Sequence, residues 1–352
     1  MTDINLSNVV EQSAENLFHD YPQLRGNTLF IDATESQRSG TLKLIGPQDP
    51  GTPVSRCLDD PESLDHLKSF ATTALRKGNS YASDDFAGIR VCVINADAYV
   101  RTLPQKDHAV AADFLVNHEA GHILIEHATA SDKTNDELKE ANADVFGVNR
   151  TLATHGLTSF HEKLPSIRSH EAIVAGETSH LTSQVVEKAL EDFRNGKNLK
   201  DMDPQALLQD CRDISAQMAT NSHEGAEIKS AFFDIRGYGP SVNDPSPLAA
   251  LTFAATKDDV SNFAFLIGAT AIKPYLTPEG KERGNGERIK LDDNMRQNLG
   301  NELATEAGRR GLDKLAAEIR ENMGSICTPM KEQLQAEKPK PAVVAIPAMV
   351  LT

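Results

Sequence analysis

Five consecutive residues, His118-Glu119-Ala120-Gly121-His122, carry the most specific chemical signal in the chain. Two histidines four residues apart lie on one face of a helix, where both imidazoles can bind the same Zn²⁺ ion. Glu119 follows the first histidine and can accept a proton from a water that the metal polarises. Three other His-Glu dipeptides, beginning at residues 161, 170 and 223, lack the second histidine. The pentapeptide therefore predicts a metal-binding helix with a general base.

The surrounding sequence favours a helix. Residues 105–129 contain no proline, and Gly121 is their only interior helix breaker. Apolar residues recur at helical spacing on both sides of the two histidines. Gly121 costs about 1 kcal/mol of helix propensity. Together with Ala120 it forms a small pair that would let another element approach closely.

A second helical run covers residues 136–156 after a polar break, with an apolar stripe and a glycine stop at Gly156. Glu140 and Asp144 are four residues apart on it and share a face. If the two helices are antiparallel, Glu140 lies opposite the histidine pair. Two histidines, one carboxylate and a water make an open catalytic zinc site. Asp144 would then accept a hydrogen bond from a ligating histidine and fix its tautomer.

The combined pattern, HExxH followed by a helical ExxxD, resembles the gluzincin clan of zinc metallopeptidases. The resemblance covers about residues 85–155. It implies a zinc-dependent endopeptidase acting on a protein or peptide substrate, with one Zn²⁺ per chain. The site residues that it implies are the ligands His118, His122 and Glu140, the general base Glu119 and, beside a ligand, Asp144.

In gluzincins a tyrosine or histidine from the later lobe often stabilises the developing oxyanion. Tyr238, in a Gly- and Pro-rich loop, and His223 are the two candidates here. Glu137, one turn before Glu140, is the alternative third ligand, but it has no aspartate four residues later. His127 lies five residues after His122 and should point away from the pair.

Other classes of metal site and of function can be weighed against this hypothesis. A metzincin needs a glycine and a third histidine further along the helix, where the chain has Ile125 and Ala128. Two alternatives remain: a dedicated regulatory or effector protease that cleaves one partner, and a catalytically silent zinc-bearing binding protein. An intact Glu119 argues against the silent protein, because structural zinc needs no general base.

Composition limits the partners and the compartment. The 352 residues carry a formal net charge of −15, which argues against nucleic acid as a partner. We find no stretch long enough to insert in a membrane. The N-terminal segment lacks the basic and apolar regions of a Sec signal, so we expect cytoplasmic localisation or export without such a signal. The four cysteines lack metal-binding spacing and are expected to be free thiols.

The expected fold class is α+β, a small sheet plus the active-site helix in a zincin-like lobe, followed by a mainly helical lobe. Strands are expected at 28–32, 41–45 and 89–94 and a helix at 64–77. The strand at 89–94 is either an edge to which a peptide adds or an internal strand. Later helices are expected at about 180–195, 204–219, 223–235, 246–272 and 293–322. The predicted domains are 1–156, 157–326 completing a cleft, and a disordered tail at 327–352.

Overall fold

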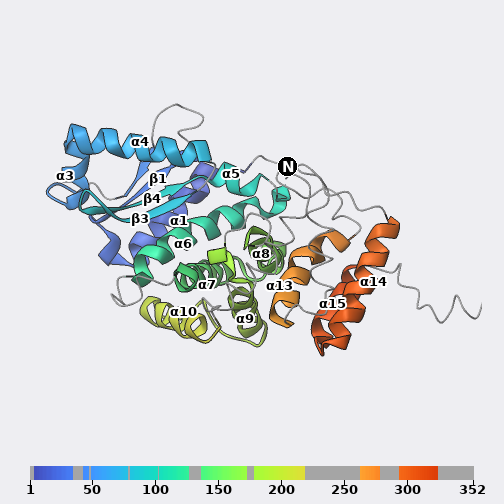
Figure 1. The fold of residues 1–352 in the computed structure, drawn as a ribbon. Coiled ribbons are helices and arrows are strands. Elements are labelled where there is room, and N and C mark those ends of the chain that lie inside the picture. Colours follow the sequence, from blue (N-terminus) through green and yellow to red (C-terminus); the bar gives the residue numbers. More distant parts are fainter. Residues whose placement is uncertain are drawn as a thin grey trace, which may run out of the picture.

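The computed structural model describes residues 4–34, 43–46, 49–77, 80–101, 103–126, 136–172, 178–218, 262–277 and 293–323. These residues are mostly helical and include a small mixed sheet, which is compatible with the predicted α+β class (Figure 1). The sheet lies at one end of the molecule, the helices α7 to α10 lie in the middle, and α13 to α15 lie at the other end (Figure 1).

The sheet has four strands in the order β2-β1-β4-β3. β1 (Thr28–Asp32) and β4 (Ile89–Ile94) are parallel, while β2 (Lys43–Ile45) and β3 (Tyr81–Phe86) pair antiparallel with them. The strand at 89–94 is therefore internal, and its interpretation as an edge is wrong. The edge strands are β2 and β3, and β3 was not predicted from the sequence. It joins β4 through Ala87 and Gly88, both with positive φ.

The two faces of the sheet carry different helices. Leu29 and Ile31 of β1 pack with α3 (Pro53–Asp59) and α4 (Pro61–Lys77), whereas Phe30 faces α1 (Leu6–Asp20) and α6 (His108–Glu126). This alternation follows from the two-residue period of a strand. The helix expected at 64–77 lies within α4. The short α5 (Ala96–Val100) leads from β4 towards α6.

The helix α6 packs directly against α7 (Asp136–His155). A Cβ atom added to Gly121 would lie only 2.9 Å from Cα of Ala143, and one added to Gly147 would lie 2.9 Å from the ring of Phe114. The two helices are thus close enough that a glycine is needed on each of them. The expectation that the small pair at 120–121 permits a close approach is confirmed.

The later helices form two groups. α8 (Ser159–His170), α9 (Ser183–Arg194) and α10 (Pro204–Met218) contribute to the same hydrophobic cluster as α1, α6 and α7. This first cluster continues through the predicted boundary at residue 156. A second cluster is formed by α13 (Asn262–Ile272), the 3₁₀ turn η5 (Lys273–Leu276), α14 (Asp293–Arg309) and α15 (Asp313–Asn322). The described part of residues 293–322 is therefore two helices, separated at Gly311.

The helices expected at 180–195 and 204–219 correspond to α9 and α10. α8 was not predicted, because Pro165 in its interior is normally a helix breaker. The helix expected at 223–235, the first part of the one at 246–272 and the tail at 327–352 lie outside the described residues. Cys57, Cys92 and Cys211 are free and buried, as expected.

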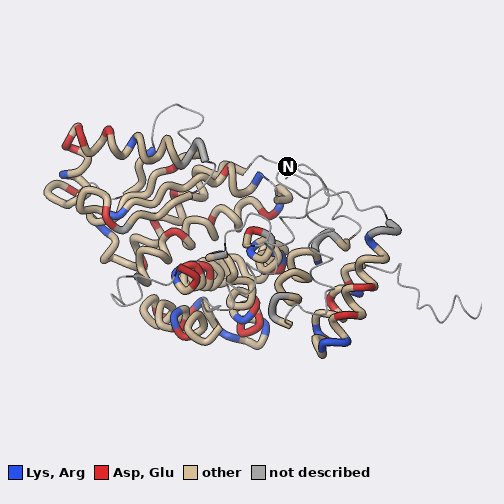
Figure 2. Tube along the Cα trace, viewed as in Figure 1, with Lys and Arg blue, Asp and Glu red and all other residues tan. Residues whose placement is uncertain are grey.

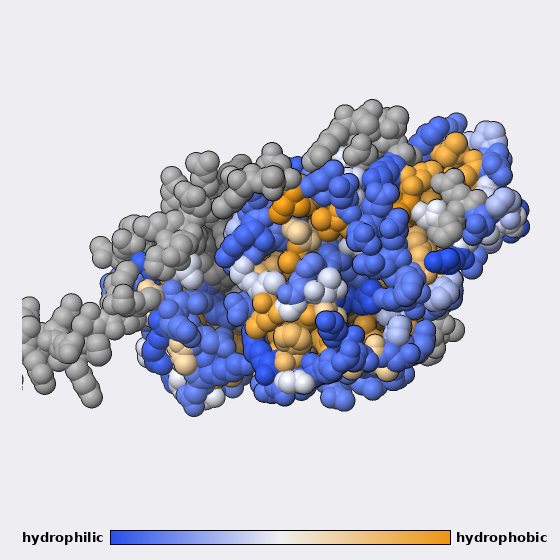
Figure 3. Space-filling model, turned by 180° about the vertical axis from the view of Figure 1, so that it is seen from behind, coloured by the Kyte–Doolittle hydropathy of each residue, from blue (hydrophilic) through white to orange (hydrophobic). Residues whose placement is uncertain are grey.

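The surface mixes charges of both signs. Figure 2 shows acidic and basic residues interspersed along the helices. Seen from behind, apolar residues reach the surface in several places among polar ones (Figure 3). Ile4 and Leu157 are the exposed large hydrophobic side chains in the described part of the chain. Among the described helices, none has the length and apolar character needed to cross a membrane.

The close packing at Gly121 gives a stability prediction. Gly121→Ala should lower the free energy of unfolding by about 1–3 kcal/mol, because the added methyl group must push α7 away from α6. This cost exceeds the gain in helix propensity of about 1 kcal/mol. Urea unfolding measures the difference. Gly308→Ala in α14 is the matched control, since a Cβ atom there meets open space and should leave stability unchanged or raised. Equal stability of G121A and wild type would contradict the packing argument.

Candidate metal centre

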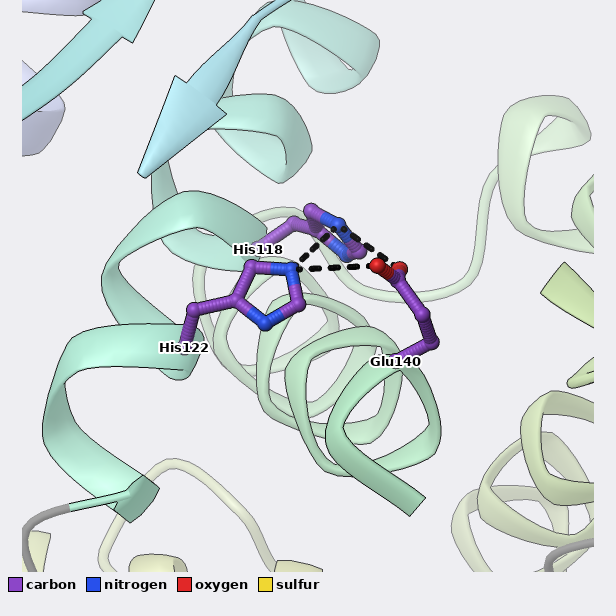
Figure 4. A group of neighbouring side chains, drawn as sticks. All are labelled: His118, His122 and Glu140. Carbon is purple, nitrogen blue, oxygen red and sulfur yellow. Dashed lines mark hydrogen bonds and ion pairs between the residues drawn. The ribbon is translucent and has the colours of Figure 1, made fainter. Parts of the chain in front are cut away.

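Three side chains from α6 and α7 converge on one point (Figure 4). The Nε2 atoms of His118 and His122 are 3.3 Å apart. Oε2 of Glu140 lies 3.5 Å from Nε2 of His118, and Oε1 lies 3.6 Å from Nε2 of His122. One potential ligand atom from each residue lies within 4.8 Å of the other two. The structure therefore brings together the three predicted ligands closely enough to hold one metal ion.

The donor set fits a divalent cation. Burial lowers the pKa of His122 to about 4, so its ring is neutral and keeps a lone pair. Burial alone would raise the pKa of Glu140, but the rings of His180, His122 and His118 outweigh it and lower the pKa to about 2. Oε2 of Glu140 is buried, and ring nitrogens of His118 and His180 lie 3.5 Å and 3.4 Å from it. Two imidazoles and an ionised carboxylate suit Zn²⁺ and several other transition metals.

Asp144 orients the first ligand, His118, through a hydrogen bond to its ring. Its Oδ1 atom lies 2.8 Å from Nδ1 of His118, so this ring donates its N–H to the carboxylate and presents Nε2 to the converging group. Thr182 donates a hydrogen bond to Oδ2 of the same carboxylate. Asp144 thus occupies the position that the sequence predicted for it, one helical turn after Glu140.

Arg168 was not predicted, and it neutralises Asp144. Its Nε atom donates a hydrogen bond of 3.1 Å to Oδ1 of Asp144, and its Nη1 atom donates one of 2.8 Å to Glu171. Nη2 lies 3.2 Å from Nδ1 of His118. Since both of these nitrogens carry protons, we assign both as donors to Asp144 rather than to each other.

Asp144 and Arg168 are both buried, and each stabilises the charged form of the other. Burial alone would raise the pKa of Asp144, but Arg168 and His118 hold it well below its usual range. Burial alone would likewise lower the pKa of Arg168, but Asp144 and Glu171 hold it well above its usual range. Both residues are therefore ionised, which makes the tautomer of His118 a fixed property of the site.

His180 is the second site residue that was not predicted, because no sequence spacing relates it to the motif. It ends the 3₁₀ turn η4 (Thr178–His180), and its Nε2 atom lies 3.4 Å from Oε2 of Glu140. Its Nδ1 atom lies 3.6 Å from Oε2 of Glu171. The three-ligand group does not include His180. It therefore borders the metal position without belonging to the converging donors.

Glu119 is 6% exposed and lies between the two histidines in sequence. Burial raises its pKa to about 7, and the negative charge of Glu140 acts in the same direction. A carboxyl group with this pKa exchanges a proton readily near neutral pH. It is thus suited to accept and then release a proton beside the metal position.

The remaining candidates divide into two sets. Glu137, the alternative third ligand, is described and does not join the converging group, which contains Glu140 instead. Tyr238, His223 and His127 lie outside the described residues. His161 is buried, and its ring hydrogen-bonds with Thr151 of α7 and with Thr158, the residue that caps the start of α8, so it has a structural role.

No protein-family model matches the chain, and no curated protein or solved structure is significantly similar to it. The likeness to gluzincins therefore remains a resemblance of residues and spacing.

The site geometry predicts which glutamate binds the metal. Glu140→Ala should weaken the binding of Zn²⁺ at least about 10-fold, because it removes the only carboxylate that faces the two histidines within the described part of the chain. Competition with a chromophoric chelator measures the affinity. Glu137→Ala is the matched control on the same helix and should bind zinc as the wild type does. Zinc affinity that falls in E137A but not in E140A would show that the ligand assignment is wrong.

Proposed function

We propose that the chain is a metal-dependent hydrolase of peptide bonds, most simply a zinc endopeptidase. The observation that carries this proposal is the convergence of two histidines and one carboxylate from α6 and α7, with the buried carboxyl group of Glu119 next to the first histidine in the chain. Catalytic zinc sites use three protein ligands, whereas structural sites generally use four. A site for structure alone would have no use for a proton-exchanging carboxyl group. The resemblance to gluzincins supports the same activity.

The chemistry divides between the cation and the chain. When bound, Zn²⁺ supplies Lewis acidity, which polarises the scissile carbonyl and lowers the pKa of water. Glu119 accepts the proton from the attacking water and later donates it to the nitrogen of the leaving amine. His118, His122 and Glu140 would hold the cation. Asp144 and Arg168 keep the ring of His118 in the tautomer that this role requires.

His180 is the candidate for stabilising the negative charge that develops on the carbonyl oxygen. Its Nδ1 atom faces Glu171, which leaves its Nε2 atom directed towards the group around Glu140. A nitrogen that carries a proton there can donate a hydrogen bond to the oxygen as its charge grows. This role was assigned from the sequence to Tyr238 or His223, and His180 joins them as a third candidate.

Two other functions stay open, and each has a distinct signature. A catalytically silent metal protein would keep the three ligands and need neither Glu119 nor His180. A dedicated protease would use the same chemistry on one partner only, so general substrates would be cleaved slowly. The dedicated protease is a narrower form of the proposed activity. Any turnover that depends on Glu119 would exclude the catalytically silent protein.

The decisive variant is Glu119→Gln. It keeps the size of the side chain but removes the proton acceptor, so peptide cleavage should fall at least about 100-fold. Zinc content and melting temperature should stay at wild-type values. Mass spectrometry of fragments from a denatured proteome, with and without a chelator, measures cleavage. Glu137→Gln is the matched control. Undiminished cleavage by E119Q would exclude the general-base role.

The three candidate donors can be ranked by the same assay. His180→Ala should lower kcat by about 10²–10³-fold with little change in KM, since the donor acts mainly in the transition state. Tyr238→Phe and His223→Ala should then be nearly as active as wild type. A large loss in either of those variants, with full activity in H180A, would transfer the role to that residue.

A further inference from the structure

Three consecutive residues, the last residue of η4 and the two that precede α9, contact three different parts of the molecule. His180 faces Glu140 and Glu171 beside the metal position. Leu181 is 2% exposed and belongs to the second hydrophobic cluster. Thr182 donates its hydroxyl to the buried Asp144. The middle residue therefore ties the two polar ones to a core that holds none of the metal ligands.

Leu181 is the only apolar residue in the stretch 178–182. The cluster that it joins consists mainly of α13, α14 and α15, with Phe265, Leu303 and Ile319 among its fully buried side chains. Burial of a leucine side chain stabilises the fold because it removes apolar surface from water. This contact is thus the main hydrophobic attachment of a short, otherwise polar turn.

The other side of the same connection is attached in the same way. Ala172, next to Glu171, is 3% exposed and also belongs to the second cluster. The helix α8, which ends just before Glu171, packs against α13. Glu171, which contacts His180, and Leu181, which follows His180 in the chain, therefore both lie next to residues attached to the C-terminal helices or are attached to them directly.

The metal ligands have a different support. His118, His122 and Glu140 are on α6 and α7, whose apolar residues form the first cluster. We propose that Leu181 is a positioning residue, through which the helical cluster α13–α15 holds His180 against the metal-binding group. The metal ligands are held by the first cluster, whereas His180, whose turn η4 also packs against α7, is attached to the second cluster through Leu181.

The consequence for catalysis rests on the proposed function, but the positioning itself does not. Loss of the Leu181 side chain should leave the ligand group intact and release His180. A displacement of about 1 Å in a catalytic group costs up to about 100-fold in rate. Leu181→Ala should therefore lower kcat about 10- to 100-fold, change KM little, and bind zinc as wild type does. In combination with His180→Ala it should cause no further loss.

The test combines this kinetic comparison with a chemical probe of the metal-free protein. Diethyl pyrocarbonate acylates neutral imidazoles, and peptide mass spectrometry gives the rate at each histidine of the full chain. We expect His180 to react several-fold faster in L181A than in wild type, while His122 keeps its rate. Leu67→Ala is the matched control, because Leu67 is fully buried in α4 on the far face of the sheet. It removes the same atoms and should leave His180 unchanged.

The outcomes separate the two proposals. Faster labelling of His180 in L181A supports the positioning role even if no peptidase activity is found, in which case only the proposed function fails. Equal labelling and equal kcat in L181A and L67A would overturn the positioning role. If circular dichroism shows that L181A does not fold, Leu181→Val removes one methylene group instead. It should give a smaller increase in labelling, and labelling no faster than in L67A would again overturn the proposal.

Discussion

The near-contact between α6 and α7 is the constraint on which the site depends. At Gly121 the backbone of one helix lies against Ala143 of the other, with no room for a Cβ atom. Glu140 is about one turn from this contact, so its carboxylate reaches the histidines on either side of the glycine. At Gly147 the helices make room for Phe114, whose ring contacts both His118 and the guanidinium of Arg168. The packing of α6 against α7 therefore positions the metal ligands and also the ring of Phe114, which contacts His118 and Arg168.

Behind the ligands lies a connected set of buried charges. Asp144 and Arg168 are 0% and 4% exposed, and burial of such groups is favourable only when each is paired and hydrogen-bonded. Arg168 meets this requirement by binding two carboxylates, one that orients His118 and one that contacts His180. A single guanidinium therefore connects a metal ligand to the residue that borders the metal position. Its location on α8 makes that helix part of the site, although the sequence motifs end before it.

The ligands could be predicted from sequence because each depends on helical periodicity alone. His118, His122, Glu140 and Asp144 form two pairs at spacing i, i+4, and the polar break between the helices implies an antiparallel pair. The tight packing was also foreseeable from Gly121. Helical spacing places such residues on one face of a helix independently of the tertiary packing.

The supporting residues could not be predicted in this way. Arg168 and His180 reach the site only through the tertiary packing of later elements, and no spacing relates them to the motif. α8 contains Pro165, and β3 has a polar sequence and a turn at Ala87 with positive φ, so both violate the usual local preferences. The position of β4 inside the sheet depends on β3, so the sequence left both an edge and an internal position open for it.

The pairing of Arg168 with Asp144 also limits which substitutions can be tolerated at these two positions during evolution. Loss of either partner alone would leave an uncompensated charge in a space closed to water, and such a protein would be selected against through its poor folding. Two apolar residues of similar volume could replace the pair together, but then the ring of His118 would lose its acceptor. In homologous chains these two positions should therefore change together or not at all. Retention of both is expected wherever the two histidines are retained.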